Sequence, residues 1–252
     1  CCVYSKTSTP SAPIIWDKKN NKGKVKALIV NAGNANAHTG KAGLKIIDKY
    51  VEALTKKIEC KASEVLVSST GVIGEKFDPK LIINKIEKLN SNNKSSLLEA
   101  SNAIMTTDTF PKVSIKNISL DNQSFKIYGI AKGSGMIQPN MGTMLVYIFM
   151  ECEASKQLMT RLLKNNLENT FNSITVDSDT STSDTLMMFS VGNKKINLNK
   201  KNFKILNNKM HDLMHDLSLQ VIKDGEGLSK LIKVNILNAR SKNQAKKIAF
   251  SI

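Results

Sequence analysis

The feature of this sequence with the most chemical potential is the junction at residues 140–146, NMGTMLV. A glycine-containing loop leads directly into an apolar run here, so Thr143 is expected at the first position of a buried strand. A threonine hydroxyl is a weak nucleophile unless a base lies beside it. If the peptide bond between Gly142 and Thr143 were cut, Thr143 would gain an α-amine with a pKa of about 7.7–8.0, which suits a general base near neutral pH.

Gly142 suits such a cut. Because glycine has no side chain, it permits unusual backbone angles and a close approach of the Thr143 hydroxyl to the Gly142 carbonyl carbon. The attack would form an ester, which water would then hydrolyse. Glycine followed by threonine at the start of a strand is nevertheless common, so the junction by itself only suggests a self-activating nucleophile.

Two histidines resemble a metal site but fit it less well. His211 and His215 are spaced like the histidines of the zinc-protease pattern HExxH, but an aspartate replaces the glutamate and no third ligand is apparent. We therefore expect solvated or partly buried helix histidines, and no metal site.

Two loops also resemble known binding patterns. The KGSG loop at residues 132–135 leads into a strand rather than a helix, and it lacks the GxxxxGK[ST] spacing, so a plain turn is favoured over a phosphate site. The polar segment 176–185 resembles a calcium loop but lacks its central glycine and closing glutamate. It remains either a flexible linker or a polar wall beside an active site.

Composition narrows the class of protein. The net charge of +16 could indicate nucleic-acid binding, but the lysines are spread along the chain and only 5% of residues are aromatic, which argues against a stacking platform. The longest apolar run, residues 144–150, is far shorter than the roughly 20 residues that span a bilayer. The four cysteines show no CxxC pair and no disulfide-like spacing, which favours a reducing, cytoplasmic setting. We therefore expect no nucleic acid and no membrane among the partners.

Hydrophobic periodicity predicts a mixture of strands and helices. Asp78 and Pro79 are expected to start one helix, as N-cap and first helical residue. The predicted strands are residues 25–30, 65–67, 113–118, 124–130, 144–150 and 230–237, and the other predicted helices are residues 41–58, 97–105, 155–170, 203–223 and a C-terminal segment. This mixture predicts an α/β or α+β fold built in layers.

Six strings resemble the ornithine acetyltransferase family, also called the bifunctional glutamate N-acetyltransferase family, and they occur in the family's order over nearly the whole chain. They are NAGNANAHTG (31–40), SSTGVIG (68–74), AIMTTDTFPK (103–112), AKGSGMIQPNMGTML (131–145), FNSITVDSDTSTSDT (171–185) and DGEG (224–227). The resemblance implies an α/β fold, an α+β layered sandwich of sheets and helices of the autoprocessing, N-terminal-nucleophile-like kind. It also implies that the chain is a fragment missing both ends, because family members extend further on either side.

The resemblance assigns roles to individual residues. It implies cleavage between Gly142 and Thr143 into an alpha chain (1–142) and a beta chain (143–252), with Thr143 as nucleophile. Thr70 and Gly71 match the oxyanion hole, which is sensible because a hydroxyl and a backbone N–H can hold a developing negative oxygen. The positions that match substrate-binding residues are Thr106, Lys132, Thr143 and Glu226, with Thr109 as the alternative within TTDT. Lys132 suits a substrate carboxylate and Glu226 an α-ammonium or a side-chain amine.

The implied reaction belongs to arginine biosynthesis. Thr143 takes the acetyl group from N-acetylornithine, releases ornithine and passes the acetyl group to glutamate, with acetyl-CoA as a possible co-substrate and no cofactor. Two alpha and two beta chains are implied to associate. An amidase or aminopeptidase that uses a freed N-terminal nucleophile and passes the acyl group to water is the alternative. The sequence departs from the usual family pattern at His38 (commonly cysteine), Gly142 (usually alanine) and Ser178 (usually glycine).

Overall fold

The computed structural model spans residues 1–252 and describes all of them except 91, 93, 122, 138–143 and 180. Gly142 and Thr143 therefore lie outside the described residues. The strands are β1 (Cys2–Tyr4), β2 (Ala27–Asn34), β3 (Val65–Val72), β4 (Lys112–Leu120), β5 (Gln123–Lys132), β6 (Leu145–Met150) and β7 (Thr185–Ser190). The α-helices are α1 (Ala12–Asn20), α2 (Gly40–Ile58), α3 (Lys80–Glu87), α4 (Leu97–Ala103), α5 (Lys156–Leu167), α6 (Lys200–Lys223) and α7 (Lys242–Ala249).

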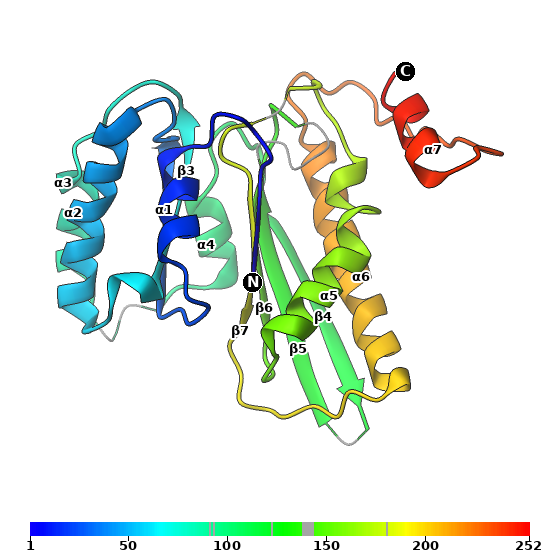
Figure 1. Cartoon of the computed structure of the whole chain (residues 1–252), viewed down its shortest axis with the longest axis horizontal. Helices are drawn as coiled ribbons and strands as arrows, with labels where there is room; N and C mark the ends of the chain where they lie inside the picture. The colour runs from blue at the N-terminus through cyan, green and yellow to red at the C-terminus, as the bar shows by residue number, and fades with distance from the viewer. Residues whose placement is uncertain (91, 93, 122, 138–143, 180) are drawn as a thin grey trace.

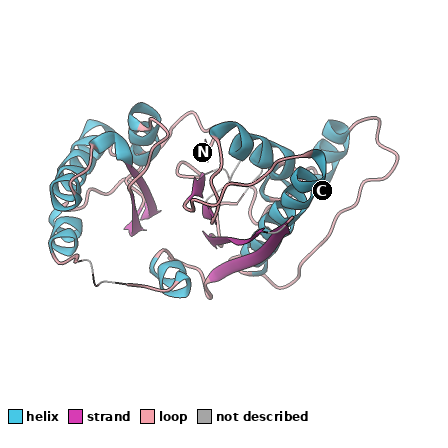
Figure 2. Ribbon diagram, turned by 90° about the horizontal axis from the view of Figure 1, so that it is seen from below, coloured by secondary structure: helices cyan, strands magenta, loops and turns pink. Residues whose placement is uncertain are grey.

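The strands form two sheets. The larger sheet has the order β1-β7-β6-β5-β4, and its β6–β7 pair is parallel while its other pairs are antiparallel. The smaller sheet is the parallel pair β2–β3. Helices α5 and α6 cover one face of the larger sheet, whereas α1, α2 and α3 pack with the smaller one, so most helices lie to the outside of the two sheets (Figures 1 and 2). The predicted mixed α/β, layered fold class is confirmed.

Strand β6 explains why the layers stay together. Its side chains alternate between two apolar clusters, with Val146 and Ile148 facing α5 and α6 and with Leu145 and Tyr147 facing the smaller sheet. A strand buried on both faces reads as a continuous apolar run, which is how it was predicted. Leu66 of β3 belongs to the same cluster as Tyr147, so the two sheets share one core.

Helices formed where apolar residues recur at helical spacing. Helix α2 buries Ile46, Ile47, Tyr50, Val51 and Leu54 on one side. Helices α5 and α6 begin after a capping serine and a capping asparagine, whose side chains accept hydrogen bonds from the backbone of the first turn. These elements agree with the predicted helices to within a few residues at each end.

Three sequence predictions about elements need correction. Residues 230–237 form no strand, because this exposed stretch pairs with none of the described strands, and Ile232 is 77% exposed. Helix α3 begins at Lys80 with Pro79 in the N-cap position, and Asp78 instead accepts a hydrogen bond from the Lys80 amide. Helix α1 and strand β7 were not predicted; the apolar residues of α1 stand next to one another and so lack helical spacing.

Helix α7 lies apart from both sheets at the end of the extended segment that follows α6 (Figure 1). None of its residues is buried. Within the described part of the chain, no helix is long and apolar enough to cross a bilayer.

Candidate active site

Most of the described residues that the sequence singles out for chemistry line one cavity of about 860 Å³. Its walls come from the ends of β2, β3 and β5, from the loop after α4, from the polar segment before β7 and from the loop after α6. Thr70, Gly71, Thr106, Lys132 and Glu226 all line this cavity. Residues from four separate parts of the sequence therefore face one cavity.

Strand β3 places Thr70 and Gly71 at the cavity. In the parallel β2–β3 pair, Ala32 lies opposite Thr70 and Gly33 lies opposite Gly71. The φ of Gly71 is +126°, and a Cβ added there would lie 2.2 Å from the carbonyl carbon of Gly33. Only glycine can therefore bring the β3 backbone this close to β2.

Lys132 is the centre of the polar side-chain network. Its Nζ donates a hydrogen bond of 2.7 Å to Thr106 Oγ1 and one of 3.1 Å to Thr70 Oγ1. It also lies 3.6 Å from Asp108 Oδ2. Burial lowers the pKa of Lys132, and the nearby carboxylate of Asp108 opposes that shift. The cavity thus holds a desolvated ammonium aligned by two hydroxyl groups.

The two threonines of the TTDT motif that were predicted as alternatives occupy different places. The Thr106 hydroxyl faces Lys132 at the cavity. Both the amide and the hydroxyl of Thr109 instead donate to Asp224, and Thr109 is not part of the cavity wall. Asp108, which the sequence reasoning did not single out, accepts hydrogen bonds from the amides of Thr106 and Gly133.

Glu226 reaches the cavity from the loop after α6. Its amide donates to the carbonyl of Ser134 at 2.8 Å. Its carboxylate lies against Gly135, because a Cβ added at Gly135 would come within 2.7–2.9 Å of the carboxyl atoms of Glu226. The cavity therefore contains an ammonium on one wall and a carboxylate on another, which suits a small ligand that carries both charges.

Asp177, Asp179 and residues 181–183 of the polar segment form a wall of this cavity, which is one of the two interpretations that the sequence left open. Asp177 Oδ1 accepts a hydrogen bond of 2.9 Å from the Ile137 amide, and Asp184 Oδ1 accepts one of 2.9 Å from the Met144 amide. These amides flank the undescribed residues 138–143. Burial raises the pKa of the Asp184 carboxyl well above its ordinary value, although the bond from Met144 opposes the shift.

Two other sequence patterns lie away from the cavity. The rings of His211 and His215 stack on one another on α6 with centroids 5.7 Å apart. Among the described residues, no group of three His, Cys, Asp or Glu side chains could hold a metal ion. Residues 132–135 follow strand β5, and the next element that the structure describes is strand β6 and not a helix, which does not fit a phosphate loop.

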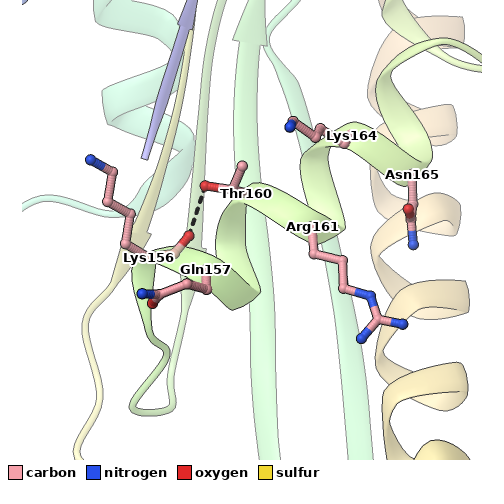
Figure 3. A pocket seen from close by; sticks show the side chains of 6 residues that line it. All are labelled: Lys156, Gln157, Thr160, Arg161, Lys164 and Asn165. Carbon is pink, nitrogen blue, oxygen red and sulfur yellow. Dashed lines mark hydrogen bonds between the residues drawn. The ribbon is translucent and has the colours of Figure 1, made fainter.

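A second hollow of about 520 Å³ lies on α5 (Figure 3) and is lined by Lys156, Gln157, Thr160, Arg161, Lys164 and Asn165. All six side chains come from this one helix. The hollow contains no carboxylate and no activated nucleophile, and its arginine stacks over the Phe203 ring at 3.8 Å. It therefore has no set of groups for catalysis.

The fold and the first cavity define a class: a mixed α/β protein with a buried lysine, hydroxyl groups and a carboxylate arranged around a site for a small polar molecule. The ArgJ family model matches residues 1–252, and the chain belongs to the ArgJ family. The family predicted from the six sequence strings is thereby confirmed.

Comparison with individual proteins agrees with this membership. The chain is 40% identical over 256 residues to the arginine biosynthesis bifunctional protein ArgJ of Bartonella henselae, covering 99% of this chain and 62% of that protein. It is 40% identical over 259 residues to the protein of the same name from Rhizobium meliloti, covering 99% and 63%. Among solved structures, the ArgJ of Bacillus halodurans matches with 32% identity and a TM-score of 0.51, over 57% of this chain and 75% of that one. The chain thus spans a little under two thirds of the length of these curated relatives.

Proposed function

We propose that the protein transfers an acetyl group from N-acetylornithine to glutamate through an acetyl ester on Thr143. The observation that carries this proposal is the Lys132 ammonium, held by the hydroxyls of Thr70 and Thr106 in a cavity that Glu226 also lines. These are the residues that the family resemblance assigns to the oxyanion hole and to substrate binding. The curated relatives are named as bifunctional proteins of arginine biosynthesis, which agrees with this reaction.

Lys132 has the donors that a substrate carboxylate needs. An ammonium has three N–H donors, and two of them go to Thr70 and Thr106. Asp108 Oδ2 lies 3.6 Å from the ammonium and forms an ion pair with it, so a substrate carboxylate would compete with Asp108 for the third donor. Glu226 then takes the side-chain ammonium of N-acetylornithine, the only ammonium that this substrate carries.

The chemistry starts with the cut between Gly142 and Thr143. The Thr143 hydroxyl then attacks the acetyl carbonyl of N-acetylornithine while the Thr143 α-amine accepts its proton. The Thr70 hydroxyl and the Gly71 N–H hold the negative oxygen of the tetrahedral intermediate. Its collapse transfers the proton to the leaving amine and releases ornithine. The amine of glutamate attacks the ester in the same way, and Thr143 recovers its hydroxyl.

A cut at this position would leave the two chains, 1–142 and 143–252, in one sheet. Strand β5 precedes the cut and β6 follows it, and they pair antiparallel from Ile127 opposite Met150 to Lys132 opposite Leu145. The buried faces of β6 hold the pair together as well. We propose that two copies of each chain assemble in the cytoplasm, with acetyl-CoA as a possible second acetyl donor and no cofactor.

Intact-mass measurement of the full-length protein tests the mechanism directly. We expect the wild type to separate into two chains at the Gly142–Thr143 bond under denaturing conditions, and the T143A variant to stay whole. Incubation with N-acetylornithine, with and without glutamate, then separates transfer from hydrolysis. Ornithine release that does not depend on glutamate would identify an amidase instead, and an uncut wild type with full activity would overturn the proposal.

A further inference from the structure

Lys112 lies buried between two carboxylates. It is fully buried at the start of β4, and its Nζ donates to Asp108 Oδ1 at 2.7 Å and to Asp224 Oδ2 at 2.5 Å. A third hydrogen bond of 3.3 Å goes to the carbonyl of Phe110. The side chains of the two aspartates are 0% and 2% exposed. This cluster of one lysine and two aspartates joins segments that are 112 residues apart in the sequence.

Stability alone gives a poor account of such a cluster. Removing three charged groups from water is costly, and well-packed apolar side chains often stabilise a protein as much or more. Burial tends to raise the pKa of both aspartates, but the hydrogen bonds from Lys112 are among the contacts that hold each pKa below its ordinary value. Both groups are therefore kept as carboxylates that accept further hydrogen bonds.

Asp108 connects this cluster to the wall of the cavity that holds the Lys132 ammonium. Its Oδ1 accepts a hydrogen bond of 2.7 Å from the amide of Gly133, the residue that follows Lys132. Its Oδ2 accepts one of 3.1 Å from the amide of Thr106 and lies 3.6 Å from Lys132 Nζ. Asp108 thus holds the backbone at Thr106 and beside Lys132, the residue that we place at the substrate carboxylate.

Asp224 connects this cluster to the loop that places the Glu226 carboxylate at the cavity. It lies two residues before Glu226 in the DGEG motif and accepts hydrogen bonds from the amide and hydroxyl of Thr109. These bonds fix the end of α6 to the TTDT loop, and the Glu226 loop leaves from this fixed point. The Glu226 amide is also bonded to the Ser134 carbonyl at 2.8 Å, so Asp224 and Ser134 together determine where Glu226 lies relative to Lys132.

We infer that Lys112 is a positioning residue that sets the separation between Lys132 and Glu226, and through it the length of diamino acid that the cavity accepts. This inference rests on the proposed function, since it takes Lys132 and Glu226 to bind the two ends of one substrate. A fixed separation between Lys132 and Glu226 favours ornithine over its homologues with one methylene fewer or more. Such discrimination amounts to about 10–200-fold for one methylene in a well-fitted site.

The test measures binding, so that it does not depend on acetyl transfer. Ornithine, 2,4-diaminobutyrate and lysine carry no acetyl group and bind without reacting. Their dissociation constants are measured by calorimetry for the full-length wild type and for K112R, which keeps the positive charge but replaces a compact ammonium with a longer, planar fork. D224N is a second variant: it removes the charge that Lys112 and Thr109 share at Asp224 but keeps one acceptor oxygen, and it leaves Asp108 unchanged.

The chain offers a matched control on the same two elements. Lys116 of β4 and Asp216 of α6 form an ion pair of 3.1 Å, and neither residue lines the cavity. K116R and D216N therefore repeat the two substitutions outside the site. We expect K112R and D224N to reduce the preference for ornithine by about tenfold or more, and the two control variants to leave it within about twofold.

The outcomes separate the inference from the proposed reaction. A K112R or D224N protein that is folded by circular dichroism and weakens the binding of all three ligands equally would overturn the length-setting role, because a merely structural residue behaves in that way. If K112R does not fold, D224N decides between the two results. A wild type that binds ornithine selectively but transfers no acetyl group would overturn the proposed reaction alone. A wild type that does not bind ornithine, or binds the three ligands equally, would overturn the inference.

Discussion

The ammonium of Lys132 donates a hydrogen bond of 3.1 Å to the hydroxyl oxygen of Thr70, although the two residues are 62 positions apart. A hydroxyl that accepts a bond at its oxygen keeps its own hydrogen for another acceptor. Thr70 also faces the cavity, so the hydrogen is available to a developing oxyanion. The same contact thus aligns a substrate-binding ammonium and orients an oxyanion donor.

Replacement of Thr70 by valine tests this donor. T70V keeps the branched shape but removes the hydroxyl, and we expect kcat for acetyl transfer to fall by about 100-fold to 1,000-fold with a much smaller change in KM. Steady-state kinetics with N-acetylornithine and glutamate measure both constants. The neighbouring Ser69 offers a control, because alternate strand residues point to opposite faces and the described residues provide no hydrogen-bond partner for its hydroxyl. S69A with a kcat as low as that of T70V would contradict the assignment.

Alanine substitutions at two facing glycines distinguish the cost of backbone strain from the cost of steric overlap. Gly33 and Gly71 both have a φ that side chains rarely adopt, +104° and +126°, but only at Gly71 would a Cβ collide with backbone. We expect G33A to destabilise the protein by about 1–3 kcal/mol through strain. G71A should lose a further ~1–3 kcal/mol, because rigid β2 backbone cannot move aside. Urea denaturation measures the two values, and equal losses would show that the overlap is relieved.

A substitution at Gly135 can displace the Glu226 carboxylate without removing its negative charge. A Cβ at position 135 would lie 2.7–2.9 Å from the Glu226 carboxyl atoms, and the backbone there is not in the left-handed region, so G135A moves the carboxylate without straining the chain. We expect KM for N-acetylornithine to rise about tenfold or more through the weakened charged hydrogen bond.

A double-mutant cycle checks that this effect passes through Glu226. If it does, G135A adds little in an E226Q background, since the charge that it displaces is already gone. Full additivity of the two substitutions in log KM would show that Gly135 acts elsewhere, for example on the backbone at Ser134.

Local patterns were sufficient to predict much of the fold. The spacing of apolar residues predicted α2, α5, α6 and the β4–β5 hairpin, because each buries one face against a neighbour. The same rule failed for residues 230–237, whose strand-like pattern pairs with none of the strands that the structure describes. Pattern alone cannot say whether a partner exists.

Some of the site residues could be predicted from sequence motifs, whereas others required the tertiary structure. Motif resemblance was enough to propose Thr70, Thr106, Lys132 and Glu226, and the structure brings all four to one cavity. The choice between the threonines of TTDT, and the whole role of Lys112, depend on Asp224, which is more than 100 residues away. Charged residues that are distant in sequence reveal their pairing only through the tertiary fold.

A buried carboxyl group links stability to pH. Asp17 of α1 is fully buried, and its Oδ1 accepts a hydrogen bond of 3.0 Å from the amide of Val67, three residues before Thr70 on β3. Tyr4 donates to its other oxygen at 3.4 Å. Burial raises the pKa of Asp17 to about 8 from an ordinary value of 3.8, and the bonds from Val67 and Tyr4 only partly oppose that shift.

The sign of the pH effect follows from proton binding. Between the ordinary pKa of 3.8 and the folded pKa of about 8, the unfolded chain has released the Asp17 proton while the folded chain still holds it. The free energy of unfolding therefore falls as pH rises through this window, by up to ~1.4 kcal/mol per pH unit from this group, and levels off above it. Asp184, whose pKa is also raised by burial, contributes with the same sign.

D17N removes the titration of Asp17 while its amide oxygen can still accept the bond from Val67. We expect the free energy of unfolding of D17N, measured by urea denaturation between about pH 5 and about pH 8, to decline less steeply with pH than that of the wild type. The exposed Asp48 of α2 supplies the control, and D48N should keep the wild-type slope. Parallel pH profiles for D17N and the wild type would mean that Asp17 ionises in the folded protein as readily as in the unfolded chain.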